Sequence, residues 1–392
     1  MKNNYLGTKI SGYVGFFVQA VVNSFLPILF IALQNVYSLN YKQLGTLMFF
    51  NFLAQMFIDA ITPLILEKIG YRKGAFLSQL MAFLGLALLS VLPNVMSPYT
   101  AMIICITIYA VGSGFTEVIL SPMIEMLPTR NKSGNMAVLH SFYCWGQACT
   151  VALTTVLVYV FGYLNWFIVP LIWSVIPFIN MWSFLKVPIV EPDPEQKTAT
   201  FFELLKDKKF LIFMLMMFCG GASEIAMAEW ASIFAQNALG VSKAVGDIAG
   251  PCAFAIFMGL GRIFYAKYSK KISFIKLLIL LNIFGFICYM AVAVCNIAVV
   301  SLVFCALCGF TVSISWPGIY SMGAASFKNG GAVMFSALAM CGDTGCCLGP
   351  WIVGLVADEM GLNWGFAVAS VFSLVIVFCG IYLLKNKDCK KV

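Results

Sequence analysis

Charge is scarce in this chain of 392 residues, because only 10% of them are Asp, Glu, Lys or Arg. An ordinary soluble domain has about 25% charged residues. The hydrophobic fraction is 61%, and histidine occurs once, as His140. This composition excludes a soluble protein and predicts a chain embedded in a membrane. The short connections between the apolar runs leave no room for a separate soluble domain.

The residue patterns of catalytic sites are also missing. The 14 Cys lie almost entirely inside apolar runs, without the spacing of metal ligands, and this placement is typical of small packing residues. The sequence has no P-loop or nucleophile arrangement, and its single His has no evident triad partners. We therefore expect a protein that is not an enzyme and that has no bound metal and no cofactor.

Long apolar runs are abundant, and a spanning helix needs about 20 apolar residues. Pro, Gly, Asn and charged residues divide the chain into twelve such runs. The first run is too long for the core of a cleavable signal and lacks a small-residue cleavage site, so we expect it to be the first spanning helix. The predicted spans are 9–34, 43–66, 74–93, 98–125, 136–160, 165–186, 210–235, 245–266, 272–294, 298–323, 331–356 and 364–384.

The basic residues are distributed unevenly between the loops. With the N-terminus placed in the cytoplasm, 22 of the 24 Lys and Arg residues fall on the inner side, and only Lys42 and Lys243 fall outside. Loops rich in Lys and Arg stay in the cytoplasm, so we predict a multi-pass protein of the cell membrane with both termini cytoplasmic. The basic rim would face anionic lipid, and a nucleic-acid partner is not expected.

A polar segment separates six predicted spans from six. It predicts an N-terminal six-helix bundle at 1–186, a cytoplasmic linker at 187–209, and a C-terminal six-helix bundle at 210–392 with a short cytoplasmic tail. The Gly-Phe-Thr run at 114–116 in span four recurs at 309–311 in span ten, each followed by Pro six residues after its Thr. This match indicates an internal repeat. The predicted fold is all-α integral membrane, with two pseudo-symmetric bundles, an architecture common among transporters.

The loop after span two carries a motif in which an acid and a base are followed by Gly and more basic residues. Glu67, Lys68, Gly70 and Arg72 occupy these positions. The segment resembles the cytoplasmic signature of the major facilitator superfamily. The resemblance implies the major facilitator fold and a gating role for these four residues.

Two further residues are associated with this motif. The copy in the second half contains Arg262, which the resemblance also assigns to a gate, although Lys270 stands where an acid is usual. Asp59 precedes Glu67 by two turns on one helical face, so its role is in the gate, in packing or in transport.

Span four contains a Gly-x-Gly-x-x-Glu run that ends at Glu117, with a small polar residue and Pro at 121–122, and His140 opens span five. This pattern resembles the fucose–proton symporter family. The resemblance implies that Glu117 takes part in proton coupling and that His140 lines the sugar site. The chain departs from that family in span one, where an acid expected near residue 27 is missing and the nearest polar residues are Gln19 and Asn23.

Ionisable side chains inside spans are costly and by default mark a pathway or a site. A carboxylate held in hydrocarbon can load and release a proton, and His is the side chain whose charge ordinarily changes near neutral pH. Glu224 and Glu229 in span seven are separated by about 140° around a regular helix, and Glu224, beside two Gly, is favoured to face the site. The residues predicted to couple protons are Glu117, His140, Glu224 and Asp343.

A sugar site needs aromatic faces for the ring, and carboxylate and amide partners for the hydroxyls. Glu117 and Ser121 lie on one stripe of span four, four residues apart. The residues predicted to bind substrate are Asn23, Glu117, Ser121, His140, Tyr143, Trp145, Gln147, Glu229, Trp230 and Trp316.

The three Arg are all expected at or near the cytoplasmic face. No cation is then expected at the centre except a protonated His140 or a helix N-terminus, which disfavours anionic substrates. The leading hypothesis is a monomeric secondary transporter that imports a small neutral polar solute, such as a monosaccharide, with protons, by alternating access around a central cavity. An exporter of cationic or apolar compounds is the alternative within transport. A membrane sensor or scaffold that transports nothing is the alternative from another class.

Overall fold

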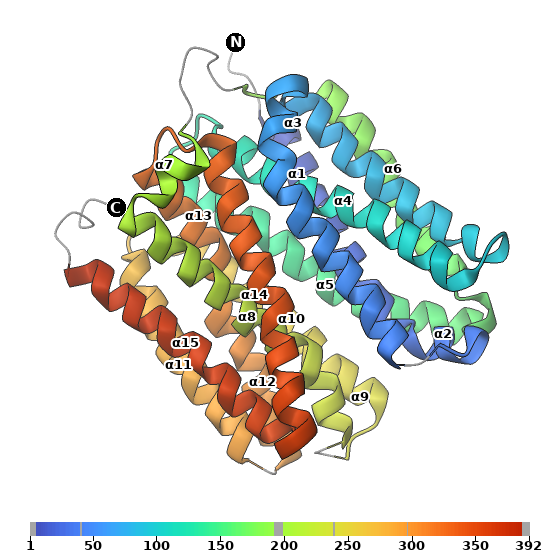
Figure 1. The fold of residues 1–392 in the computed structure, drawn as a ribbon. Helices are drawn as coiled ribbons and strands as arrows, with labels where there is room; N and C mark the ends of the chain where they lie inside the picture. Colours follow the sequence, from blue (N-terminus) through green and yellow to red (C-terminus); the bar gives the residue numbers. More distant parts are fainter. Residues whose placement is uncertain (1–4, 40, 192–198, 238–239, 296, 386–392) are drawn as a thin grey trace. The chain divides into compact units, whose positions relative to one another are not determined.

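The computed structural model describes residues 5–385 except residues 40, 192–198, 238–239 and 296. Helices are the only regular secondary structure in these ranges, as predicted. The predicted tail beyond residue 385 and part of the predicted linker lie outside the described residues. The chain forms two compact units (Figure 1), the first made of residues 1–127 and 149–193 and the second of residues 128–148 and 194–392.

The first unit contains the helices that precede the linker, apart from the first half of α5. They are α1 (Leu6–Ile28), α2 (Phe30–Tyr37), α3 (Tyr41–Leu89), η1 (Leu92–Asn94), α4 (Pro98–Glu125), the second half of α5 (Lys132–Phe161), η2 (Tyr163–Asn165) and α6 (Ile168–Lys186).

The second unit contains the first half of α5 and all helices from α7 onward. They are α7 (Phe201–Leu205), α8 (Lys208–Asn237), α9 (Lys243–Asp247), η3 (Ile248–Cys252), α10 (Ala253–Tyr268), α11 (Phe274–Val294), α12 (Ala298–Val312), α13 (Ser315–Ser326), α14 (Gly331–Met360) and α15 (Leu362–Lys385).

Eleven helices in the described part of the chain are long and apolar enough to span a membrane. The predicted spans 43–66 and 74–93 both lie in α3, which is helical throughout except at Gly70, where φ is 75°. The predicted span 9–34 is divided at Leu29, two residues after a Pro that a helix interior tolerates poorly. The twelve predicted spans are thus ten of these helices and the two arms of α3.

Close contact between α3 and α4 organises the first unit, in which α1 also packs on α4 and α6 packs on α3. A Cβ atom on Gly112 would lie 2.5 Å from the carbonyl oxygen of Ser78, so the two backbones nearly touch. In a bilayer, small residues at such crossings let helices associate by packing alone. Phe25, Leu86 and Tyr109 fill the apolar core beside this crossing.

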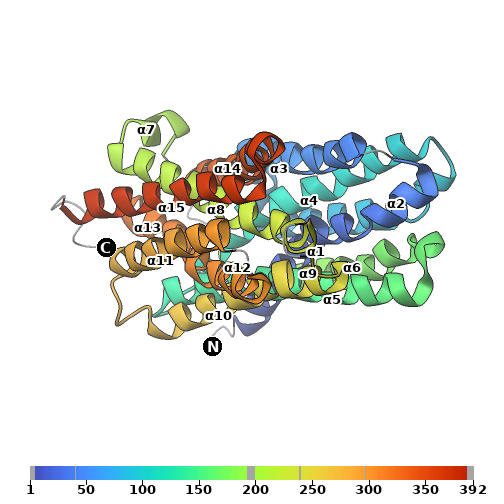
Figure 2. The same cartoon turned by 90° about the horizontal axis from the view of Figure 1, so that it is seen from below.

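The second unit is built from the helix pairs α8 with α14, α11 with α15, and α10 with α12. Figure 2 shows α15 running beside α11. Gly309 and Gly345 lie at two of these crossings, where a Cβ atom would overlap the backbone of Phe254 and Phe218 respectively. Residues 313–314 interrupt the helical path between α12 and α13.

Residues 128–148 belong with the second unit, although they precede the linker. Asn131 donates to the carbonyl oxygen of Ala266 at 3.3 Å and accepts from Ser269 Oγ at 3.0 Å. The compact units differ from the sequence halves 1–186 and 210–392 in this segment, and the division into those halves stays a prediction.

Candidate functional site

Glu117 is buried in the first unit, with 6% of its surface exposed. It lies on α4, and its Oε2 accepts a hydrogen bond of 2.7 Å from Nε2 of Gln19 on α1. The neighbouring Gly114 lets α3 approach closely, because a Cβ there would lie 3.0 Å from the carbonyl oxygen of Gln55 and 3.1 Å from Asp59 Oδ1. The Glu117 carboxylate is thus bonded to a carboxamide of span one, the span in which the acid expected near residue 27 is missing.

Three more amide side chains lie in the same unit. Asn23 Oδ1 accepts from Asn51 Nδ2 at 3.2 Å and from Gln55 Nε2 at 3.0 Å. Gln55 Oε1 in turn accepts from Ser113 Oγ at 2.7 Å. Asn23 was predicted to bind substrate, whereas Asn51, Gln55 and Ser113 were not singled out. Their spacing in the sequence could have identified them, because α1, α3 and α4 each carry two polar residues four positions apart.

A second amide group lies in this unit, between α3, α4 and α6. Asn180 Nδ2 donates to Gln79 Oε1 at 3.2 Å and to the carbonyl oxygen of Ser11 at 3.1 Å. Gln79 Nε2 donates to Thr116 Oγ1 at 3.4 Å, and Ser183 Oγ donates to Asn180 Oδ1 at 3.0 Å. Every side-chain polar atom of the two amides is hydrogen-bonded, as expected of amides that join helices.

Asp59 and Ser121 are both completely buried in the first unit. Asp59 faces Gly114, three residues before Glu117, across the contact between α3 and α4, so this predicted gating residue lies away from the loop that follows span two. Ser121 is one helical turn after Glu117 on α4, as its spacing predicts.

Arg72 and the break at Gly70 organise the predicted gate in the first unit. Arg72 Nη1 donates to three carbonyl oxygens in residues 184–187 at 2.9 to 3.0 Å. Two of these carbonyls lie in the last turn of α6, where they have no partner within the helix, and the third is that of Val187, the residue that follows α6. The backbone N–H groups of Tyr71 and Arg72 donate to the carboxylate of Glu191 at 3.2 and 3.4 Å.

This arrangement fastens the start of the linker to the break in α3. Thr8 Oγ1 adds a hydrogen bond to the carbonyl oxygen of Pro188. Glu67 and Lys68, the other two predicted gating residues in this segment, are exposed. The role of Glu191 could not be read from the superfamily-like motif, because it lies 119 residues from Arg72 along the chain.

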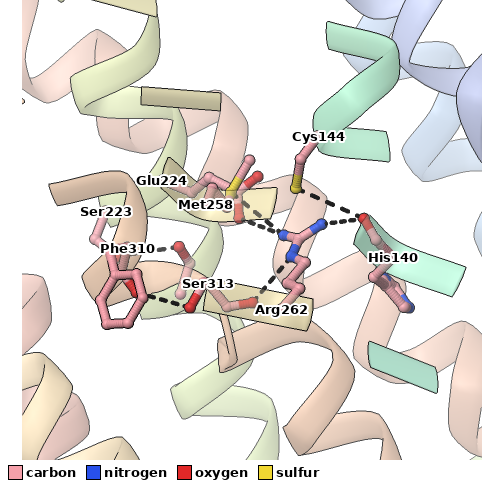
Figure 3. Close-up of polar contacts among 9 residues, drawn as sticks. His140, Cys144, Ser223, Glu224, Met258, Arg262, Phe310 and Ser313 are labelled. Carbon is pink, nitrogen blue, oxygen red and sulfur yellow. Dashed lines mark hydrogen bonds and ion pairs between the residues drawn. The ribbon is translucent and has the colours of Figure 1, made fainter. Parts of the chain in front are cut away.

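Arg262 joins four segments of the second unit (Figure 3). Its Nε donates to the carbonyl oxygen of Ser313 at 2.9 Å, and Nη1 donates to that of His140 at 2.6 Å. Nη2 forms an ion pair of 3.3 Å with Glu224 Oε2 and contacts Met258 Sδ at 3.4 Å. The Ser313 carbonyl lies in the interruption between α12 and α13, so the guanidinium binds an oxygen that no helix satisfies.

This position corrects the expectation that no Arg side chain is buried inside the bundle. Arg262 is only 1% exposed. It lies six residues before the end of α10 at Tyr268, and helical side chains tilt toward the helix N-terminus. The guanidinium therefore reaches away from the end of the helix and into the bundle, where Glu224 meets it from the middle of α8.

The predicted residues of span five lie in the part of α5 that belongs to the second unit. His140 is 3% exposed, and its ring centroid lies 5.6 Å from that of Tyr320 on α13. Gln147 is buried, whereas Tyr143 and Trp145 are half-buried. The ring of Trp145 packs against Gly259 on α10, where a Cβ would lie 3.1 Å away.

The remaining predicted residues come from α8, α13 and α14. Glu229 is exposed, in contrast to the buried Glu224 one and a half turns earlier, as their angular separation requires. Trp230 Nε1 donates to the carbonyl oxygen of Pro350 at 3.0 Å. Trp316 packs against Gly342, and Asp343 beside that Gly is half-buried.

The structure therefore groups the predicted residues in two sets. In the first unit, Glu117, Asn23 and Asp59 share the polar contact region of α1, α3 and α4. In the second unit, Glu224 and the backbone of His140 are joined through Arg262. The sequence assigned Arg262 to a gate and Glu224 to proton coupling, and the structure pairs them.

This chain is similar to known membrane proteins over most of its length. The family model described as Major Facilitator Superfamily matches residues 12–350. The membrane protein MosC of Rhizobium meliloti is 23% identical over 355 residues, which are 91% of this chain and 85% of that protein.

Two solved structures have a similar fold. The E. coli fucose:proton symporter superposes with a TM-score of 0.80 at 16% identity, covering 97% of this chain and 99% of that chain. A proton:xylose symporter bound to 6-bromo-6-deoxy-D-glucose superposes with a TM-score of 0.79 at 12% identity, covering 97% and 95%. At these identities the likeness concerns the fold alone.

Proposed function

Because this chain belongs to the Major Facilitator Superfamily, we propose that it imports a small neutral polar solute, such as a monosaccharide, together with protons. The protein works as a monomer in the cell membrane, with both termini in the cytoplasm. Its binding site opens alternately to the two faces of the membrane, as in other transporters built from repeated halves. The two solved neighbours are named as sugar:proton symporters, which supports the same class of solute.

The contact between Glu117 and Gln19 carries the proposal. A buried carboxylate that is hydrogen-bonded to a neutral amide can exist in the charged or the protonated form, because the amide can donate to one form and accept from the other. Proton entry to Glu117 would favour solute loading from outside, and proton release would favour return of the empty site. Buried acids in spans are characteristic of such proton pathways.

The test is uptake into liposomes that contain the purified protein and carry an imposed pH gradient. We expect an inward proton gradient to drive accumulation of at least one sugar from a panel of fucose, xylose, glucose and myo-inositol. Glu117→Gln should abolish accumulation against a gradient while exchange of labelled for unlabelled sugar continues. Glu359→Gln is the matched control, since Glu359 is exposed near the end of α14. Uptake that does not depend on the proton gradient, or that is unchanged in Glu117→Gln, refutes the proposed coupling.

Two carboxylates of the second unit that are not fully buried favour a second candidate, the export of cationic compounds. Glu229 is exposed and Asp343 is half-buried, and acids at such positions can bind an organic cation by charge. In the same liposomes, proton-driven movement of an organic cation such as ethidium, without movement of any sugar, would establish this candidate in place of the first.

A further inference from the structure

Three helices of the first unit each carry two polar side chains four residues apart. The pairs are Gln19 and Asn23 on α1, Asn51 and Gln55 on α3, and Ser113 and Glu117 on α4. Residues four apart share one face of a helix. The three faces meet, because hydrogen bonds join α1 to α3, α3 to α4, and α1 to α4 within this set. We call these six residues the amide layer.

Five of the six residues of the amide layer are buried, and Asn23 is partly accessible. Asn51 and Gln55 are 1% and 2% exposed, whereas Asn23 is half-buried. Asn23 Oδ1 receives hydrogen bonds from both of those amides. A solute that approaches Asn23 would therefore meet the donor groups of Asn51 and Gln55 directly behind it.

Two amide oxygens of the layer are buried without a hydrogen-bond partner among the described residues. They are Asn51 Oδ1 and Gln19 Oε1. Buried polar atoms are almost always hydrogen-bonded, and an amide oxygen can be satisfied only by a donor. The second amide group of the same unit, Gln79 with Asn180, leaves no such oxygen.

The chemistry of the layer selects a class of solute. Amides offer N–H donors and carbonyl acceptors at adjacent atoms, and a hydroxyl group both donates and accepts. Neighbouring hydroxyls can thus exchange hydrogen bonds with Asn23 and Gln55 while donating to the oxygen of Asn51. An anion would be repelled by these oxygens and by the Glu117 carboxylate.

We propose that the amide layer is a hydroxyl-binding site, in which Asn23, Asn51 and Gln55 contact neighbouring hydroxyl groups of a neutral polyol. This inference rests on the proposed function, since it names the groups that recognise the imported solute. It assigns recognition of the solute to α3, for which the sequence had predicted no substrate-binding residue.

The test is equilibrium binding to the purified full-length protein in detergent, with no proton gradient. The probes are fucose, xylose, glucose and myo-inositol, together with monodeoxy derivatives of whichever sugar binds. A neutral hydrogen bond of about 1 kcal/mol corresponds to a change of about fivefold in Kd. We expect one or two deoxy derivatives to bind wild type at least fivefold more weakly than the parent sugar.

The variants Asn51→Leu and Gln55→Met should bind the parent sugar at least fivefold more weakly than wild type. In each variant, the deoxy derivative that lacks the contacted hydroxyl should bind as well as the parent, because the bond is already lost. Gln79→Met is the matched control, since it removes a buried amide from the same unit outside the layer. It should lower thermal stability and leave the Kd and the ranking of the deoxy derivatives unchanged.

The proposal is overturned if Asn51→Leu and Gln55→Met preserve the wild-type ranking of deoxy derivatives. Asn51→Ala, which also removes the acceptor oxygen, provides the same comparison if Asn51→Leu does not fold. Unchanged rankings combined with normal proton-driven uptake refute the hydroxyl site and leave the proposed function intact. If none of the four sugars binds or is transported, the proposed function fails and this inference fails with it.

Discussion

Replacing Arg262 by Met should destabilise the second unit by about 3 to 5 kcal/mol, which is the usual effect of removing one partner from a buried ion pair. The substitution leaves the Glu224 carboxylate without its cation and the carbonyl oxygens of His140 and Ser313 without their donor. Arg262→Lys should recover little of this loss, because an ammonium group cannot reach three acceptors that a planar guanidinium binds in different directions.

A double-mutant cycle isolates the ion pair from the rest of the network. Glu224→Met alone leaves the guanidinium charge buried, again at a cost of about 3 to 5 kcal/mol. The variant that carries both substitutions should lose about 2 to 3 kcal/mol less than the sum of the two single losses, since neither charge is then left unpaired.

The assay is reversible unfolding in mixed detergent micelles, followed by the fluorescence of the eight Trp residues. Arg130→Met is the matched control, because Arg130 is exposed and such substitutions usually change stability by less than about 0.5 kcal/mol. A loss below about 1 kcal/mol in Arg262→Met, or strict additivity in the cycle, would show that the guanidinium does not stabilise the four segments that it joins.

Three further predictions concern other features of the structure. Gly70→Ala should lower the free energy of unfolding by about 1 to 3 kcal/mol, because residues with a side chain rarely adopt its φ of 75° and ψ of 166°. Gly162→Ala is the control, because no heavy atom lies near the Cβ added there. A loss of stability in this control therefore comes from backbone strain and not from contacts of the new side chain. Arg72→Gln should accelerate proteolytic cleavage in the linker several-fold, since it releases the carbonyls at the end of α6, and an unchanged cleavage rate would contradict that anchoring. The backbone N–H of Thr200 holds the pKa of Glu203 below its ordinary value of 4.5. The resulting stabilisation of α7 is therefore present at neutral pH and lost as pH falls through that lowered pKa; nuclear magnetic resonance of the Thr200 amide should follow this titration in wild type and not in Glu203→Gln.

The helices and the general location of the buried acids could be predicted from the sequence, because both follow from local composition. Apolar runs located the spans, and the motif around Gly70 located the break in α3. The position of Glu117 four residues before Ser121 placed both on one face of α4. These inferences need only the spacing of residues within one helix.

The partners of these residues could not be predicted, because they come from distant parts of the chain. Arg262 was expected at or near the cytoplasmic face from the distribution of the basic residues, yet its long side chain extends back into the bundle to Glu224. Asn51 and Gln55 were not predicted as site residues, because an uncharged amide in a span is not by itself evidence of a site. Their significance depends on the meeting of three helix faces.

The pairing of Arg262 with Glu224 also sets an order of events during biosynthesis. The two residues are 38 positions apart, so at about 5 to 20 residues per second Arg262 is synthesised about 2 to 8 seconds after Glu224. Until Arg262 follows, α8 has no cation for this acid, and an ionised side chain at the centre of a helix in the bilayer costs about 2.5 to 3.5 kcal/mol. The His140 carbonyl, 122 residues before Arg262, is made earlier still. Helix α10 can therefore join α5 to α8 as soon as it enters the bilayer, and the Ser313 carbonyl, 51 residues after Arg262, is made last and completes the network.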